Sequence, residues 1–162
     1  MPYDGILLGV DPSLRGTGLA VIAFKPGETA RLLSSQTVKI KANASMPECL
    51  AAIAEAIFRY ADDFNIQEAA VEQTIYVQNF QTAQILGAAR GAALTALALR
   101  GIPIAEYAPL RIKQAVVGFG RASKDQVAGM IRSQLALAEL LSSDESDAAA
   151  AALCHATSWR PV

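Results

Sequence analysis

The order of apolar segments along the chain constrains its fold more than any other feature of the sequence. Three short apolar runs come first, separated only by turns that contain glycine or proline, which is typical of consecutive antiparallel strands. The later segments alternate between strand and helix lengths, which is typical of parallel strands with helical crossovers. We therefore expect an α/β fold with a five-stranded mixed sheet, antiparallel strands first and parallel strands after, and helices on both faces.

The expected elements follow that order. Strands are expected at residues 6–10, 19–24, 32–40, 68–72 and 102–105, and helices at 46–64, 79–99, 109–117, 123–137 and 145–158. Pro103 would confine the last strand to an edge of the sheet, because proline has no amide hydrogen to donate. No repeat or linker divides the 162 residues, so we expect a single domain over 1–162.

Composition narrows the class of protein. The formal net charge of −1 excludes a uniformly basic nucleic-acid binder. Cys49 and Cys154 lie far apart, without zinc-site spacing, and are expected to be buried thiols. The N-terminus lacks a basic region before its apolar run, and the longest charge-free helical stretch, 148–159, is too short to cross a membrane. We expect a soluble, cytoplasmic protein.

Carboxylates at the ends of two expected strands are the first candidates for chemistry. Asp11 follows the first strand and Glu72 ends the fourth. Ligands of open α/β sheets bind at the carboxyl ends of the strands, and parallel neighbouring strands would bring these two side chains together. The alternatives are a turn aspartate before Pro12 and an exposed strand-end glutamate.

A second pair of acids lies at the start of the last helix. Asp144 and Asp147 are three residues apart and share one helix face. The alternative is that these two acids only stabilise the start of the helix. Ser142 and Glu145 form a possible capping box there, and negative charge in a first turn interacts favourably with the helix dipole. Carboxylates from three elements would suit hard cations such as Mg²⁺. Two such ions ~4 Å apart can stabilise the attacking and the leaving oxygen when a phosphodiester is hydrolysed.

Basic residues gather between residues 100 and 132. This segment carries a charge of +4 and leaves −5 for the remainder; its basic members are Arg100, Arg111, Lys113, Arg121, Lys124 and Arg132. Such a segment suits contact with nucleic-acid phosphates, although two or three of its residues could simply form a solvated helix face. His155, the only histidine, is expected to be a core or helix-face residue rather than a metal ligand or general base.

The set of motifs resembles the RuvC family of Holliday junction resolvases, within the RNase H-like nuclease superfamily. The resemblance covers nearly the whole chain, and the order and spacing of its pieces are specific although each piece alone is weak. The matching pieces are Leu8–Pro12 with Thr17 and Gly18, Val71–Gln73 with Asn79, Leu86–Gly91, Glu106–Ala108, Lys113–Gly118, Lys124 with Gln126 and Val127, and Asp144–Ala148.

The resemblance implies roles for particular residues. The four acids Asp11, Glu72, Asp144 and Asp147 match metal-binding positions, for two Mg²⁺ ions or Mn²⁺, and Lys113 and Lys124 match basic residues near the scissile phosphate. The helix around Gly87 and Gly91 matches a homodimer interface. Together with the basic segment, this gives an expected DNA-binding set of Tyr76, Phe80, Arg111, Lys113, Arg121 and Lys124.

The chain departs from the family pattern in three places. The usual Asp-Pro-Gly is Asp11-Pro12-Ser13, and the usual phenylalanine after the glutamate is Ile75, so Tyr76 or Phe80 could supply the ring that enters the junction centre. The sequence ends at Val162 without a basic tail, so DNA affinity is expected to depend on few phosphate contacts and modestly on salt.

The expected function is therefore that of a structure-selective endodeoxyribonuclease in recombination and repair. As a homodimer working with a branch-migration motor, it would nick four-way junctions symmetrically and leave 5′-phosphate and 3′-hydroxyl ends. The alternatives are another RNase H-like nuclease, such as a ribosomal-RNA-processing resolvase-like protein, and a non-catalytic junction-binding module. A sugar-kinase or actin-like ATPase would need two such domains, for which the chain is too short.

Overall fold

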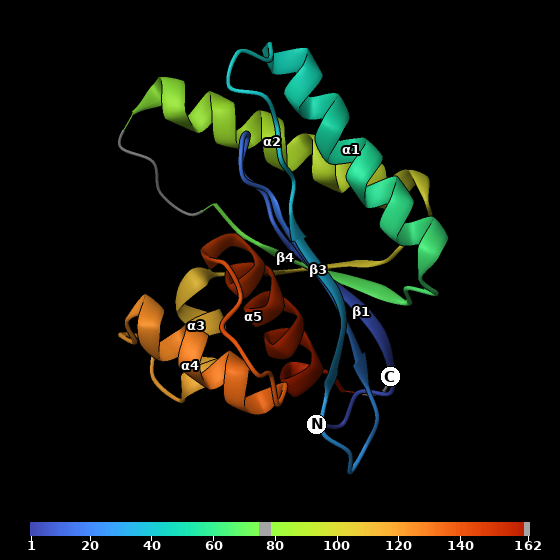
Figure 1. The fold of residues 1–162 in the computed structure, drawn as a ribbon, viewed down its shortest axis with the longest axis vertical. Coiled ribbons are helices and arrows are strands. Elements are labelled where there is room, and N and C mark those ends of the chain that lie inside the picture. The colour runs from blue at the N-terminus through green and yellow to red at the C-terminus, as the bar shows by residue number, and fades with distance from the viewer. Residues whose placement is uncertain (75–78, 161–162) are drawn as a thin grey trace.

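The computed structural model describes residues 1–74 and 79–160, and it contains one five-stranded sheet in the order β3-β2-β1-β4-β5 (Figure 1). The strands are β1 (Gly5–Asp11), β2 (Gly18–Phe24), β3 (Arg31–Thr37), β4 (Glu68–Glu72) and β5 (Ile104–Tyr107). The helices are α1 (Met46–Asp63), α2 (Phe80–Leu99), α3 (Pro109–Val117), α4 (Lys124–Gln134) and α5 (Ser143–Ser158).

The strand directions confirm the mixed sheet. β1 pairs antiparallel with β2, and β2 pairs antiparallel with β3. On the other side of β1, β4 and then β5 run parallel to it. The antiparallel half is joined by short turns and the parallel half by helices, as the lengths of the apolar segments predict.

Several element boundaries differ from the prediction by one to three residues, and three of these differences have a clear physical reason. β3 ends at Thr37 rather than at residue 40, because its partner β2 begins at Gly18, which pairs with Thr37. β5 begins after Pro103, whose carbonyl still accepts a hydrogen bond from the amide of Ala69 at 2.8 Å. α4 ends at Gln134 rather than at residue 137, because Ala136 takes a positive φ of 50° that a helix does not allow.

Helices cover both faces of the sheet, so each central strand is buried on both sides. The side chain of Leu7 packs in one hydrophobic cluster with α3, α4 and α5, while Leu8 and Val10 pack in another with α1 and α2. In Figure 1, α3, α4 and α5 lie below the sheet and α1 and α2 above it. This explains why the strands read as continuous apolar runs rather than as alternating patterns.

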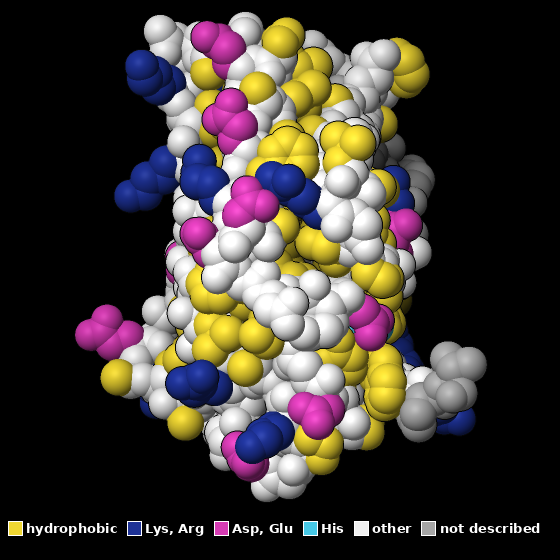
Figure 2. Space-filling view, turned by 90° about the vertical axis from the view of Figure 1, so that its right-hand side faces the viewer, with side chains coloured by type: hydrophobic (Ala, Val, Ile, Leu, Met, Phe, Trp, Pro, Cys, Tyr) yellow, Lys and Arg dark blue, Asp and Glu magenta, His cyan; other side chains and the backbone are white. Residues whose placement is uncertain are grey.

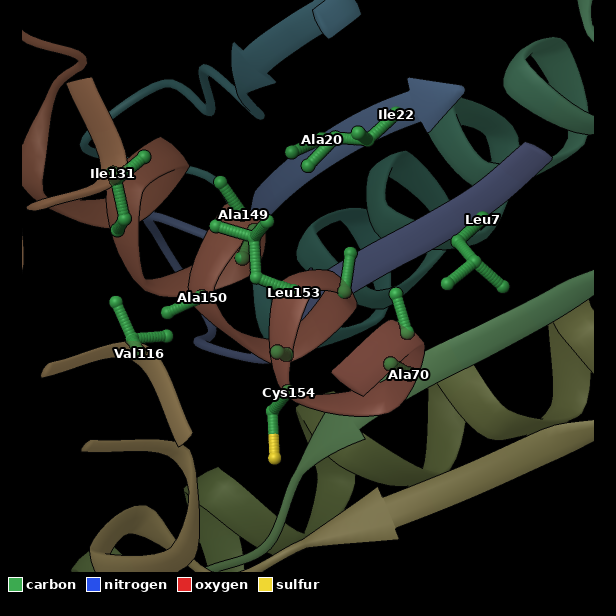
Figure 3. Close-up of a cluster of buried hydrophobic side chains, with 14 of the residues drawn as sticks. Leu7, Ala20, Ile22, Ala70, Val116, Ile131, Ala149, Ala150, Leu153 and Cys154 are labelled. Carbon is green, nitrogen blue, oxygen red and sulfur yellow. The ribbon is translucent and has the colours of Figure 1, made fainter. Parts of the chain in front are cut away.

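Helix α5 lies unusually close to the sheet because neither surface has bulky side chains where they meet. Five consecutive alanines, residues 148–152, are buried on it. A Cβ atom on Gly9 would lie 1.9 Å from the carbonyl oxygen of Ala148, and one on Gly18 would lie 1.9 Å from that of Asp144. Figure 3 shows Ala149 and Leu153 of α5 gathered in this cluster with side chains from β2, β4 and α3. The close approach sets the position of the first turn of α5.

Helix α2 is longer and more apolar than the helical stretch singled out from the sequence. By length and composition alone, α2 could cross a membrane. A search for stretches without charged residues does not find this helix, because Arg90 lies within it. Only 22% of its apolar window is buried. The buried side chains, Ala89, Ala93, Ala96 and Leu97, pack in the cluster shared with α1.

The net charge of the chain is close to zero. On the face that Figure 2 shows, acidic and basic side chains lie among hydrophobic ones, so neither sign of charge dominates this face. Both cysteines are buried free thiols, which confirms their expected state.

Candidate functional site

Four carboxylates from three elements meet at one edge of the sheet. Asp11 is the last residue of β1 and Glu72 the last of β4. The two strands are parallel neighbours, with Val10 opposite Val71, so the carboxylates that follow lie side by side. The expectation that these strands run parallel is confirmed. Asp144 and Asp147 reach the same edge from the first turns of α5, because Gly18 lets the backbone of Asp144 lie directly over β2.

The capping box at the start of α5 exists, and it uses Glu145 rather than the two aspartates. Glu145 Oε2 accepts a hydrogen bond from the Ser142 amide at 3.1 Å, and Ser142 Oγ accepts one from the Glu145 amide at 3.4 Å. Asp144 instead accepts a bond from Thr37 Oγ1 at 3.4 Å. Capping and site formation are therefore divided between neighbouring acids. Sequence reasoning missed Thr37, because only the sheet brings the end of β3 to α5.

Burial and neighbouring negative charge raise the pKa of the two strand-end acids. Burial, followed by the charges of Glu72, Asp147 and Asp144, raises the pKa of Asp11 to about 7. Burial and the charge of Asp147 likewise raise the pKa of Glu72. Such a cluster disfavours its own charged form, and positive charge placed among the carboxylates relieves the penalty.

Two lysines form one wall of the site. Lys124 Nζ lies 3.2 Å from Asp147 Oδ2, and the charge of Asp147 raises the pKa of this lysine. Lys113 and Lys124 line a pocket of about 180 Å³ together with Glu72 and Asp147. A second pocket of about 380 Å³, lined by Asp11, adjoins it, since Glu72 and Pro109 line both. Asp11, Glu72 and Asp147 thus line a cleft with cations on the α3–α4 side.

The comparisons with known proteins decide the family. The family model described as crossover junction endodeoxyribonuclease RuvC matches residues 7–155. The chain belongs to the RuvC family. RuvC of Halorhodospira halophila is 44% identical over 150 residues, covering 93% of this chain and 89% of the relative, and RuvC of Methylobacillus flagellatus is 43% identical over 155 residues, covering 93% and 86%.

Solved structures agree with this assignment. T. thermophilus RuvC in complex with a Holliday junction substrate superposes with a TM-score of 0.89 at 34% identity, covering 94% of this chain and 93% of that one. The yeast mitochondrial Holliday junction resolvase Ydc2 superposes with a TM-score of 0.66 at 12% identity, covering 97% and 82%, and shares the fold. RuvC family members are endodeoxyribonucleases that use divalent metal ions.

The acid cluster fits the cation that the family uses. Its donors are all carboxylate oxygens, the ligands that hard divalent cations prefer. Among the described residues, no three His, Cys, Asp or Glu side chains have already converged as a ligand set.

The structure does not bring every expected DNA-binding residue of this RuvC family member to the cleft. Arg111 Nη2 donates to Ser158 Oγ at 3.1 Å, at the end of α5 opposite to its two aspartates. Arg121 is exposed in the loop between α3 and α4, just after Gly118, which caps α3 with a left-handed conformation. Phe80, the first residue of α2, is 79% exposed. Tyr76 lies outside the described residues.

His155 belongs to a buried hydrogen-bonded network rather than to the acid cluster. It is 5% exposed, its Nδ1 pairs with the Tyr107 hydroxyl at 2.8 Å, and its Nε2 pairs with Glu68 Oε2 at 3.0 Å. These bonds join α5 to β5 and β4, the last of which carries Glu72. The expectation of a core histidine is confirmed.

Proposed function

We propose that this chain nicks four-way DNA junctions by metal-dependent phosphodiester hydrolysis, in recombination and repair in the cytoplasm, as a single nuclease domain over 1–162. The observation that carries the proposal is that Asp11, Glu72, Asp144 and Asp147 come together at one edge of the sheet, beside the pocket that Lys113 and Lys124 line with Glu72 and Asp147. In a chain of the RuvC family, this arrangement supports the endonuclease activity for which the family is named.

The four carboxylates would hold two Mg²⁺ ions, or Mn²⁺. Bound there, such ions supply a water of lowered pKa and a positive clamp on the attacking and leaving oxygens. The lysines contribute charge of their own. The ammonium of Lys124 stands at the pocket wall beside Asp147, and Lys113 lines the same pocket, so both can neutralise oxygens of a bound phosphate. Arg121, exposed between α3 and α4, would contact a neighbouring phosphate.

A substrate comparison tests this function. The protein is incubated with a mobile four-way junction, a linear duplex and an RNA–DNA hybrid, each with Mg²⁺ or EDTA. We expect symmetric nicks in the junction alone, with 5′-phosphate ends, and none in EDTA. Preferential cutting of the hybrid or of RNA would assign the chain to another RNase H-like activity. Junction binding without nicking would assign it a non-catalytic role.

We propose that the chain acts as a homodimer through α2, since two symmetric nicks need two related sites. One face of α2 remains exposed and carries small or short side chains at helical spacing: Gln84, Gly87, Gly91, Thr95 and Ala98. Cβ atoms added at Gly87 and Gly91 would meet nothing within 4 Å. Such a face permits close packing of two helices. A branch-migration motor as a further partner stays a prediction.

Replacing Gly91 by Leu is expected to convert the dimer to monomer without unfolding the chain. The larger side chain has open space in the monomer but would separate two closely packed helices. Sedimentation equilibrium at micromolar concentration measures the change, and Gly129→Leu on α4, which also has open space, is the matched control. Equal dimerisation of both variants and the parent would place the interface elsewhere.

The exposed ring of Phe80 also has a proposed role. It stands at the start of α2, directly after the segment that follows Glu72. We propose that Phe80, or Tyr76 in that segment, stacks on bases at the opened junction centre.

A further inference from the structure

We propose that a second basic surface, formed by Arg15, Lys39 and Lys41, binds the phosphate backbone of the DNA strand that crosses the acid cluster. This surface, called here the β3-side basic surface, lies on the other side of the acids from Lys113 and Lys124. The inference rests on the proposed nuclease function and adds to it a place where the strand is held.

The order of the sheet places the two basic sets on either side of the acids. Asp11 and Glu72 end β1 and β4, in the middle of the sheet. Lys113 follows β5 at one edge, whereas Lys39 and Lys41 follow β3 at the other. In Figure 1 the segment between β3 and α1 lies above the sheet, and α3 and α4 lie below it. The acids therefore stand between two positive walls.

The spacing matches the backbone of one DNA strand. β3 lies two strands from β1, which is roughly 10 Å at the usual separation of paired strands. A B-form strand carries one phosphate per ~3.4 Å of helix axis, so about three phosphates span that distance. The β3-side basic surface would thus meet phosphates adjacent to the one held at the acids.

Direct contacts tie this surface to the acid cluster. A Cβ atom on Gly16, the neighbour of Arg15, would lie 3.1 Å from Asp144 Oδ2. Thr37, two residues before Lys39, donates a hydrogen bond to the same oxygen at 3.4 Å. Both segments of the surface therefore begin beside a proposed metal-binding carboxylate rather than at a remote part of the fold.

Arg15 fixes the surface in shape. Its Nη1 donates to the Lys41 carbonyl and its Nη2 to the Ala44 carbonyl, each at 2.9 Å. These bonds tie the loop after β1 to the segment after β3, and they leave further guanidinium N–H groups for an anion. Arg15, Lys39 and Lys41 are all exposed. A prearranged set of cations loses little conformational entropy when it binds phosphate.

The part of the chain that carries this surface is rich in basic residues. Between Pro12 and Pro47 the chain has five basic residues and one acid, Glu28, which pairs with Lys25 at 3.2 Å in the distant β2–β3 turn. Glu48 accepts bonds from the amide and hydroxyl of Ser45 at the start of α1. Lys39 lines a pocket with Glu55, Glu145 and Arg59, so Arg15 and Lys41 supply most of the positive charge that this surface offers to a phosphate backbone.

The salt dependence of junction binding tests the inference. Affinities are measured in EDTA from 50 to 200 mM salt, with Asp11→Asn as the parent so that no cleavage occurs, and with Lys39→Ala/Lys41→Ala added to it. Each lost phosphate contact lowers the slope of log affinity against log salt by about 0.9. Over this range we expect the parent to lose about tenfold more affinity than the double variant does.

Lys25→Ala in the same parent is the matched control, because Lys25 lies at the opposite end of β2 and should leave the slope unchanged. All three proteins should give the same thermal midpoint, since the substituted lysines are exposed. A double variant with the slope of its parent would overturn this inference alone. A parent that does not distinguish a junction from a linear duplex would count against the proposed function instead.

Discussion

Asp11→Asn is expected to lower the rate of junction nicking by a thousandfold or more while making the metal-free protein more stable at pH 8. Loss of a carboxylate from a divalent-cation site removes transition-state stabilisation of several kcal/mol, and ~4 kcal/mol corresponds to about a thousandfold in rate. The gain in stability has a separate cause. Asp11 is buried and lies among like charges, so its ionised form is a cost to the folded chain that asparagine does not carry.

The pH dependence of unfolding separates these two effects. The pKa of Asp11 is raised from 3.8 to about 7 in the folded chain, so the native state binds this proton more tightly than the unfolded state does. The stability that this contributes is fully present below about pH 4 and is lost as the pH rises through about 7. In EDTA, the free energy of unfolding of the parent should therefore fall relative to that of Asp11→Asn across this window.

Urea unfolding at pH 4.5 and pH 8, with and without Mg²⁺, measures the effect. At pH 8 in EDTA the variant should be the more stable protein, and Mg²⁺ should stabilise the parent by about 2.7 kcal/mol at a hundredfold excess over its dissociation constant. Asp63→Asn, an exposed carboxylate at the end of α1, is the control and should change neither activity nor the pH profile. Normal nicking by Asp11→Asn would remove Asp11 from the proposed site.

Gly18→Ala is expected to destabilise the fold by about 3 kcal/mol or more and to lower nicking with it. The new Cβ atom would lie 1.9 Å from the Asp144 carbonyl oxygen and 2.4 Å from its carbonyl carbon, distances that force α5 away from the sheet. The obstacle is backbone, so no side-chain rotation relieves it. Because Asp144 and Asp147 move with α5, the acid cluster should lose its geometry in the fraction that still folds.

Thermal unfolding checks this prediction, with an expected fall in midpoint of about 6 to 12 °C for a chain of this size. Gly129→Ala on α4 is the matched control, because a Cβ atom there meets nothing within 4 Å. In a helix interior that change should raise stability by up to ~1 kcal/mol. A midpoint for Gly18→Ala equal to that of the parent would show that α5 has room to shift.

Much of the site could be predicted because its parts end regular elements. β4 was predicted at 68–72, as observed, since three apolar residues between two glutamates leave little choice of boundary. Its parallel pairing with β1 was only a condition for Asp11 and Glu72 to meet, and the structure satisfies that condition. The boundary of β3 could not be predicted in this way, because it depends on where β2 begins and on the bonds that Arg15 makes to the segment beyond.

The distribution of charge could likewise be predicted only in part from the sequence. Summed charge identifies the segment 100–132 as basic and gives the remainder a net charge of −5, and that sum hides the basic stretch between Pro12 and Pro47. The fold also separates residues within the basic segment, since Arg111 faces Ser158 while Lys113 faces Glu72 and Asp147. Side chains two positions apart on a helix point in different directions, and only packing decides which of them faces the cleft.

The sequence by itself determined the element order and the mixed sheet and singled out Asp11 and Glu72, because hydrophobic periodicity and strand-end carboxylates are local properties. Asp144 and Asp147 are predicted site residues through the resemblance to the RuvC family. Only the tertiary structure decided that α5 lies close enough to bring Asp144 and Asp147 to Asp11 and Glu72. That distance depends on Gly9 in β1 meeting the backbone of Ala148 and on Gly18 in β2 meeting the backbone of Asp144, residues more than a hundred positions apart. Their fit is a matter of steric contact across the sheet, which no local pattern in the sequence encodes.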